Sequence, residues 1–288
     1  MKVIFFGTSE FAIPSLEALI EANSGLIAVI TAPDRLAGRG KKQILSPVKT
    51  WLKESAPKIK ILEPEKINDD FISEISKLAP DLGIVASYGK ILPQKLIDMF
   101  PKGILNVHPS LLSKYRGASP IQTTILNGDT KTGVSIMLVD SKMDHGPILA
   151  RKELDIASPP EVEWDYEFLH DTLAKFGAKL LIETLPKWIN GEITPEVQNE
   201  SMATYTKMLK KEDGLIDWSK PAEYIERMIR AYNPWPGTFT KMKNGKILKI
   251  KKAEISNGKL KILIVQPEGK KEMPYEAFLR GNPDFKAF

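Results

Sequence analysis

The sequence contains no cysteine and only three histidines among its 288 residues. Without thiols it has neither a disulfide framework nor a thiolate metal site. The histidines, His108, His145 and His170, do not form an HExxH or similar ligand cluster. We therefore expect no dedicated zinc site and no metal cofactor.

Long apolar runs are also absent, since no stretch approaches the roughly 20 apolar residues needed to cross a bilayer. The apolar start of the chain, residues 1–7, is too short for a signal peptide, and no small-residue cleavage pattern follows it. Residues 2–6 are better interpreted as a buried first strand. We therefore expect a cytoplasmic protein with no membrane partner.

The net positive charge is small, at +5, and alone it is weak evidence for a nucleic-acid partner. The basic residues are nevertheless clustered. One glycine-containing segment holds Arg35, Arg39, Lys41 and Lys42, and a later segment holds Lys241, Lys243, Lys246, Lys249, Lys251 and Lys252. Two interpretations stay open for these clusters: a solvated face with a charged edge strand, or a nucleic-acid interface.

The first half of the chain contains a regular alternation of elements. Short apolar strands are predicted at residues 2–6, 26–31, 60–62, 82–86 and 103–107, and helices at 15–22, 46–54, 68–78 and 94–99. The basic segment 35–43 shows no periodicity and is predicted to be a loop. The alternation predicts an α/β fold with a doubly wound, mostly parallel, Rossmann-like sheet, whose ligands bind beyond the carboxyl ends of the strands.

The second half of the chain changes character toward its end. A helix at 120–127, an extended run at 132–139 and a long helix at 166–183 are predicted first. A polar, irregular stretch follows, and two Asn-Gly pairs, at 244–245 and 257–258, then mark turns between short strands. We predict a large domain over 1–190, a linker over 191–210 and a small C-terminal β domain over 211–288.

Two polar side chains lie at the end of the apolar strand predicted at 103–107. Asn106 and His108 stand at positions i and i+2, so on a strand they share one face. A carboxamide donor and an imidazole suit an acyl-transfer site, because the oxyanion needs donors and an attacking amine must lose a proton.

Asp144 lies in a turn-rich loop, residues 140–147, that follows another strand. A carboxylate that reaches His108 would fix the tautomer of the imidazole and raise its basicity. Spacing alone leaves a second interpretation open, in which His108 is a core histidine bonded to the backbone and Asp144 is an ordinary turn residue.

Residues 106–117, Asn-Val-His-Pro-Ser-Leu-Leu-Ser-Lys-Tyr-Arg-Gly, followed by the loop at 140–146, resemble the folate-dependent formyltransferases. The combined motif is long and ordered, and therefore specific. Further similar stretches lie at 6–12, 33–42, 216–218, 229–237 and 266–273, so the resemblance spans nearly the whole chain. The stretch 33–42 is similar to the basic loop that enters the tRNA acceptor stem in members that act on initiator methionyl-tRNA.

The resemblance implies an activity. The formyl group of 10-formyltetrahydrofolate would pass, without a metal, to the α-amine of methionine on initiator methionyl-tRNA for translation initiation. Asn106 and His108 would hold the developing oxyanion, and Asp144 would orient His108 and assist removal of the proton from the amine. We expect such an enzyme to be a monomer.

The resemblance also implies binding residues. The implied folate-contacting residues are Tyr88, Gly89, Lys90, Ile91, Leu92, Ser110, Leu111, Leu112, Ser113 and Asp140. The implied tRNA-contacting residues are Arg35, Arg39, Lys41 and Lys42.

Two features depart from the family's pattern. Ser113 stands where a proline is usual, and the stretch 240–268 is short for every strand of the family's C-terminal OB-like barrel, which predicts a shortened barrel. The shortening leaves open an amino sugar or other small amine as the acceptor. An RNA-binding protein without catalysis and a hydrolase that releases formate are further alternatives.

Overall fold

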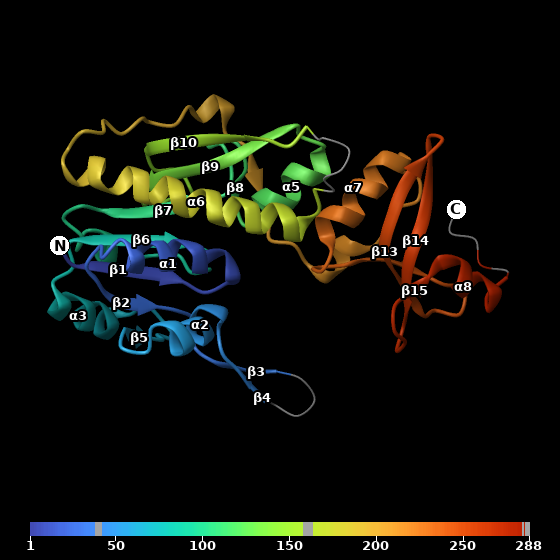
Figure 1. The fold of residues 1–288 in the computed structure, drawn as a ribbon, viewed down its shortest axis with the longest axis horizontal. Coiled ribbons are helices and arrows are strands. Elements are labelled where there is room, and N and C mark those ends of the chain that lie inside the picture. The colour runs from blue at the N-terminus through green and yellow to red at the C-terminus, as the bar shows by residue number, and fades with distance from the viewer. Residues whose placement is uncertain (38–41, 158–163, 284, 286–288) are drawn as a thin grey trace. The chain divides into compact units, whose positions relative to one another are not determined.

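The structure is a computed structural model that describes residues 1–37, 42–157, 164–283 and 285 (Figure 1). The chain divides into two compact units. Unit 1 comprises residues 1–116, 133–154 and 171–205, and unit 2 comprises residues 117–132, 155–170 and 206–288. Within the described ranges, no helix is both long enough and apolar enough to cross a membrane.

The centre of unit 1 is a seven-stranded sheet. Its strands are β1 (Val3–Gly7), β2 (Leu26–Ile30), β5 (Lys60–Leu62), β6 (Leu82–Ala86), β7 (Ile104–His108), β9 (Lys131–Leu138) and β10 (Ile148–Asp155), in the order β10-β9-β7-β6-β1-β2-β5 (Figure 1). The pairs from β7 to β5 are parallel, and β9 pairs with β7 antiparallel. The predicted α/β, mostly parallel sheet is confirmed.

Most helices in this part of the chain connect strands of the sheet, and the last one follows β10. They are η1 (Glu10–Ala12), α1 (Ile13–Glu21), α2 (Pro47–Ser55), α3 (Asp69–Leu78), α4 (Gln94–Ile97), α5 (Pro120–Asn127) and α6 (Tyr166–Ile189). The side chain of Ser46 accepts a hydrogen bond from the backbone of Lys49, and that of Asn68 from the backbone of Phe71. These caps fix the starts of α2 and α3, because the first N–H groups of a helix have no partner inside it.

The two faces of the sheet are buried by different elements. Ile104 of β7 belongs to a core cluster that includes Phe71 and Leu96 from the helices α3 and α4. On the opposite face Val107 meets α6 at Gly177, where an added Cβ would lie 2.6 Å from Val107 Cγ1. Because side chains alternate along a strand, Asn106 and His108 lie on the Ile104 face.

The segment predicted to be a loop at 35–43 is partly a hairpin, so that prediction is wrong. Strand β3 (Arg35–Ala37) pairs antiparallel with β4 (Lys42–Ile44). This two-stranded ribbon lies outside the main sheet, and its side chains with a described position, Arg35, Gln43 and Ile44, are exposed. It therefore leaves no alternation of apolar and polar residues in the sequence.

Unit 2 contains the small β domain. The strands β12 (Thr238–Lys241), β13 (Ile247–Ser256), β14 (Lys259–Pro267) and β15 (Met273–Pro274) form an antiparallel sheet in chain order, with α7 (Ala222–Tyr232) and α8 (Tyr275–Arg280) beside it. In the described part of the chain β12 and β15 are the two edges, so the sheet is open there. Helix α7 also packs on α5, where Arg227 donates to the carbonyl of Leu126.

Short elements occupy the stretch between α6 and α7. They are η2 (Glu200–Met202), β11 (Tyr205–Thr206) and η3 (Lys211–Gly214), and β11 pairs with β8 (Arg116–Gly117). The part of this stretch up to residue 205 belongs to unit 1, and the part from residue 206 onward belongs to unit 2.

Candidate active site

The strand β7 and the loop after β9 bring together the three predicted catalytic side chains. Asn106 and His108 end β7 on one face, and Asp144 lies in the loop between β9 and β10. Asp144 adopts a left-handed backbone, with φ +48°. A non-glycine residue in this conformation is uncommon and is held by its surroundings.

The Asp144 carboxylate lies between the other two side chains. Asn106 donates from Nδ2 to Asp144 Oδ1 over 3.2 Å, and His108 Nδ1 lies 3.7 Å from Asp144 Oδ2. The second distance is too long for a hydrogen bond but close enough for the carboxylate to stabilise a protonated imidazole. His108 is only 4% exposed. The carboxylate can therefore act on both the carboxamide and the imidazole.

The other nitrogen of His108 fixes the tautomer. His108 Nε2 lies 3.0 Å from the backbone carbonyl of Tyr115, which can only accept a hydrogen bond. Nε2 therefore carries a proton, and Nδ1 is the nitrogen whose protonation can change. That nitrogen faces Asp144, which is the arrangement required of an imidazole that moves a proton beside a carboxylate.

The predicted folate-contacting stretch 110–113 is a tightly bonded turn. Ser110 donates from its hydroxyl to the carbonyl of Lys114, and the Ser135 hydroxyl bridges the turn by accepting from Leu112 N and donating to Ser110 O. Leu112 is buried against Met137 and Ile148, and the peptide bond that follows it is cis. The turn thus presents a fixed backbone next to the trio, with its side chains largely committed to the protein itself.

The second predicted folate-contacting stretch, residues 88–92, follows β6. The carbonyl of Tyr88 accepts from the Thr8 hydroxyl, and Lys90 donates to the carbonyls of Pro64 and Glu65. Ile91 is 77% exposed, and an added Cβ on Gly89, which has φ +79°, would meet open space. The outer side of this turn is accessible and apolar.

The hydroxyl of Tyr88 is buried and, among the described residues, has no hydrogen-bond partner. Burial raises the pKa of Tyr88 to about 12. The folded protein therefore holds the phenolic proton of Tyr88 more tightly than the unfolded chain does. This adds to the free energy of unfolding fully below pH 10, and the contribution is lost as the pH rises toward 12.

We expect Tyr88→Phe to raise the free energy of unfolding by up to about 1 kcal/mol at pH 7, because a buried hydroxyl without a partner costs stability. The variant should also lose less stability than wild type between pH 10 and 12. Urea unfolding at both pH values tests this, with the half-buried Tyr224→Phe as a control. A clear loss of stability at pH 7 would show that the hydroxyl is bonded after all.

Asp140 was predicted to contact folate. Its Oδ1 accepts from Lys142 N over 2.9 Å, and its Oδ2 lies 2.6 Å from His145 Nδ1. The other nitrogen of His145, Nε2, lies 3.5 Å from Glu200 Oε1. Asp140 and His145 therefore brace the loop that carries Asp144.

The predicted tRNA-contacting residues are described only in part. Arg35 is exposed on β3, whereas Arg39 and Lys41 lie outside the described residues, and only the backbone of Lys42 is described.

The base of the hairpin is anchored by ion pairs. Lys49 of α2 pairs with Asp34 at 2.7 Å and with Glu63 at 2.8 Å. Hydrogen bonding to Lys49 holds the pKa of Asp34 below its usual range. The chain therefore enters β3 from a fixed point.

Sequence reasoning missed three residues that support the site: Arg116, Ser135 and Gln198. Arg116 and Ser135 are completely buried, and Gln198 is 4% exposed. The sequence did contain a signal for Ser135, because a hydroxyl inside the apolar strand β9 needs a hydrogen-bond partner. Gln198 had none, because it stands alone in a polar stretch without periodicity.

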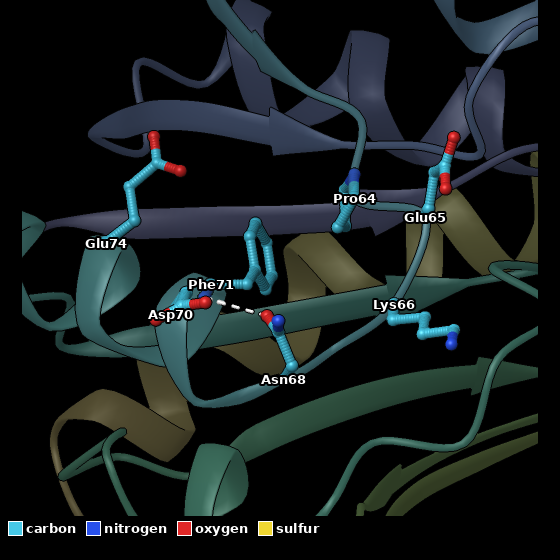
Figure 2. A pocket seen from close by; sticks show the side chains of 7 residues that line it. All are labelled: Pro64, Glu65, Lys66, Asn68, Asp70, Phe71 and Glu74. Atoms are coloured by element: carbon cyan, nitrogen blue, oxygen red, sulfur yellow. Dashed lines mark hydrogen bonds between the residues drawn. The ribbon is translucent and has the colours of Figure 1, made fainter.

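A hollow of about 480 Å³ lies at the start of α3, and the trio is not part of its lining. It is lined by Pro64, Glu65, Lys66, Asn68, Asp70, Phe71 and Glu74 (Figure 2). Three of these seven residues carry carboxylates, and only Pro64 and Phe71 are apolar. The candidate active site is therefore defined by the side-chain geometry at β7 and not by this hollow.

Comparison with known proteins agrees with the site. Residues 1–185 match the family described as formyl transferase, and residues 208–259 match its C-terminal domain. The chain therefore belongs to the formyl transferase family, and the resemblance seen in residues 106–117 and 140–146 is confirmed.

Curated relatives define its place within this family. The chain is 46% identical to the methionyl-tRNA formyltransferase of Chloroflexus aurantiacus over 89% of its own length and 81% of the relative's. It is 40% identical to that of Caldanaerobacter subterraneus, covering 98% and 97% of the two chains. The chain is accordingly a member of the methionyl-tRNA formyltransferases.

Solved structures share the fold. The methionyl-tRNA formyltransferase from Clostridium thermocellum has a TM-score of 0.61 at 20% identity, covering 93% of this chain and 98% of that one. An N-formyltransferase from Helicobacter canadensis, in complex with folinic acid and dTDP-3-aminofucose, has a TM-score of 0.66 at 20% identity, covering 89% and 88%. At such identity the likeness concerns the fold alone.

Proposed function

We propose that this enzyme transfers the formyl group of 10-formyltetrahydrofolate to the α-amine of methionine on initiator methionyl-tRNA. The observation that carries the proposal is the Asp144 carboxylate, which lies between Asn106 and His108. Identity of 40–46% to curated methionyl-tRNA formyltransferases supports the choice of acceptor.

The reaction forms a bond between the amine nitrogen and the formyl carbon and breaks the bond from that carbon to N10 of the folate. The amine loses a proton, and N10 gains one. The tetrahedral intermediate carries an oxyanion that needs donors. Asn106 Nδ2 has two protons, of which one points to Asp144, so the second serves as a donor.

His108 supplies the second donor in its protonated form, through Nδ1–H on the side of Asp144. Asp144 stabilises that charge and assists removal of the amine proton. The Tyr115 carbonyl holds the ring by Nε2, so the ring does not need to reorient during the reaction.

The residues present fit a folate as the donor substrate. The exposed Ile91 and the open space beside Gly89 offer an apolar rim for a planar ring. The turn at 110–113, fixed by Ser135, offers backbone groups next to the trio. Tyr88, Lys90, Leu92 and Asp140 would support this surface, Lys90 by its side-chain bonds to the carbonyls of Pro64 and Glu65 and Asp140 by its carboxylate.

The decisive experiment measures formyl transfer by the full chain. Purified protein would be mixed with 10-formyltetrahydrofolate and methionyl initiator tRNA, and formylmethionyl-tRNA would be quantified. We expect product and an equal amount of tetrahydrofolate. Formate released without product would indicate a hydrolase, RNA binding without turnover would indicate a binding protein, and formylation of an amino sugar alone would overturn the acceptor.

The basic segment with Arg35, Arg39, Lys41 and Lys42 is proposed to contact the tRNA. We expect Arg39→Ala to raise the KM for methionyl-tRNA several-fold and to leave the KM for folate unchanged. Each lost phosphate contact should also reduce the slope of log affinity against log salt by about 0.7 to 0.9.

Steady-state kinetics at several salt concentrations measures both effects. Lys77→Ala, which removes an exposed cation from α3, is the matched control. An unchanged dependence on tRNA concentration in Arg39→Ala would remove this segment from the tRNA site.

A further inference from the structure

The stretch that follows α6 contributes a buried amide to the catalytic loop. Gln198 is 4% exposed, and its Nε2 donates to the backbone carbonyls of Asp144 and Gly146, each over 2.8 Å. We propose that Gln198, held by Arg116, is the positioning residue that sets the Asp144 carboxylate against Asn106 and His108. The inference rests on the proposed function and adds a residue to its machinery.

The orientation of the Gln198 amide is fixed by chemistry. Its Oε1 accepts from Arg116 Nε over 3.1 Å and from Arg116 Nη2 over 2.9 Å. A guanidinium only donates and a carbonyl only accepts, so a flipped amide would meet the wrong partner on both sides. All hydrogen-bonding groups of the amide are therefore used, and the side chain has one position.

Arg116 is itself held rigidly. It is completely buried, and it donates to both carboxylate oxygens of Glu200, from Nη1 over 3.1 Å and from Nη2 over 2.7 Å. Its Nη1 also donates to the hydroxyl of Tyr205 over 3.0 Å. Hydrogen bonding to Arg116 holds the pKa of Glu200 below its usual range. The guanidinium charge is thus balanced, and its planar fork forms a fixed base for Gln198.

The loop that carries Asp144 needs a fixed support because its backbone adopts a costly conformation. Asp144 has φ +48°, a conformation that is costly for a residue with a Cβ. Two residues further on, an added Cβ on Gly146 would lie 1.9 Å from the carbonyl of Leu138, so the loop passes close to β9. Gln198 donates to the carbonyls of Asp144 and Gly146, which lie on either side of His145, and so holds Asp144 in this conformation.

A positioning role predicts a particular kinetic result. Gln198 acts through the backbone of Asp144, so its loss should displace the carboxylate without removing any group that binds a substrate. Misplacement of a catalytic group by about 1 Å costs on the order of 10²-fold in rate. We therefore expect Gln198→Ala to lower kcat by about 10- to 100-fold with both KM values within twofold of wild type.

The test is a double-mutant comparison in the full chain. The formyl transfer rate is measured for wild type, Gln198→Ala, Asp144→Asn and the double variant, with thermal unfolding of each. If Gln198 acts through Asp144, its loss should cost less than about threefold once Asp144 is already changed. Gln198→Met, which fills the space without donors, should behave like Gln198→Ala and keeps the test valid if alanine prevents folding.

Glu196→Gln is the matched control. Glu196 lies two residues away on the same stretch and pairs with Arg151, at 2.8 Å, on the surface. It should keep the wild-type kcat.

Two results would overturn the inference: a folded Gln198→Met with kcat within threefold of wild type, or an equal fold loss in the Asp144→Asn background. The proposed function is judged separately, by whether the wild type formylates methionyl-tRNA. With another amine as acceptor, the same four rates could still be compared.

Discussion

Replacing Asp144 by asparagine is expected to lower kcat by about 10²- to 10⁴-fold, the range that general acid–base catalysis contributes. The carboxamide has nearly the same shape, so the contact with Asn106 over 3.2 Å can persist through its oxygen. The negative charge near His108 Nδ1 is lost, however, and with it the stabilisation of a protonated imidazole and the group that assists removal of the amine proton.

Single-turnover formyl transfer measures this effect, and equilibrium binding of folate shows whether the site is otherwise intact. Folate affinity should stay within a few-fold of wild type. Asp98→Asn, an exposed carboxylate that accepts from Gln94, is the matched control and should leave the rate unchanged. Near-wild-type turnover in Asp144→Asn would remove this residue from the catalytic machinery.

The second large effect is expected at His108. In His108→Gln the side-chain amide can place a donor near the position of Nε2 and so keep the bond to the carbonyl of Tyr115. It has no group that can gain a proton beside Asp144. We expect kcat to fall by about 10²- to 10⁴-fold while the protein stays folded.

His108→Asn provides the matched comparison, because its shorter amide loses the bond to Tyr115 as well. It should be as inactive as His108→Gln but less stable, by about 1 kcal/mol for the lost hydrogen bond and the carbonyl left without it. Thermal unfolding and the transfer assay separate the two effects. Substantial activity in either variant would show that the reaction does not need the imidazole.

Part of this site follows from the sequence by simple geometry. Asn106 and His108 must share a face because a strand has a period of two, and they must lie near a ligand because β7 ends there. The approach of Asp144 could not be predicted in this way. It depends on β9 lying antiparallel beside β7 and on a left-handed residue in the following loop, so only the family resemblance indicated it.

The main sheet was predictable because its central strands are buried on both faces and give continuous apolar runs. The edge strand β10 was not predicted. Only its first two residues, Ile148 and Leu149, are fully buried, and charged residues occupy most of the remainder. The hairpin of β3 and β4 left no apolar pattern for a similar reason. In both cases backbone pairing forms a strand whose sequence does not follow a regular apolar pattern.

The hydrogen bonds of Arg116 determine how a C-terminal truncation affects stability. A fragment ending near residue 190 would retain Asn106, His108 and Asp144 but lose Gln198 and Glu200. Arg116 would then keep its charge inside the protein without two of its main partners, a situation that strongly destabilises a fold. A chain truncated after residue 205 keeps these partners, so we expect it to be more stable than one truncated after residue 190, and thermal unfolding of the two compares them.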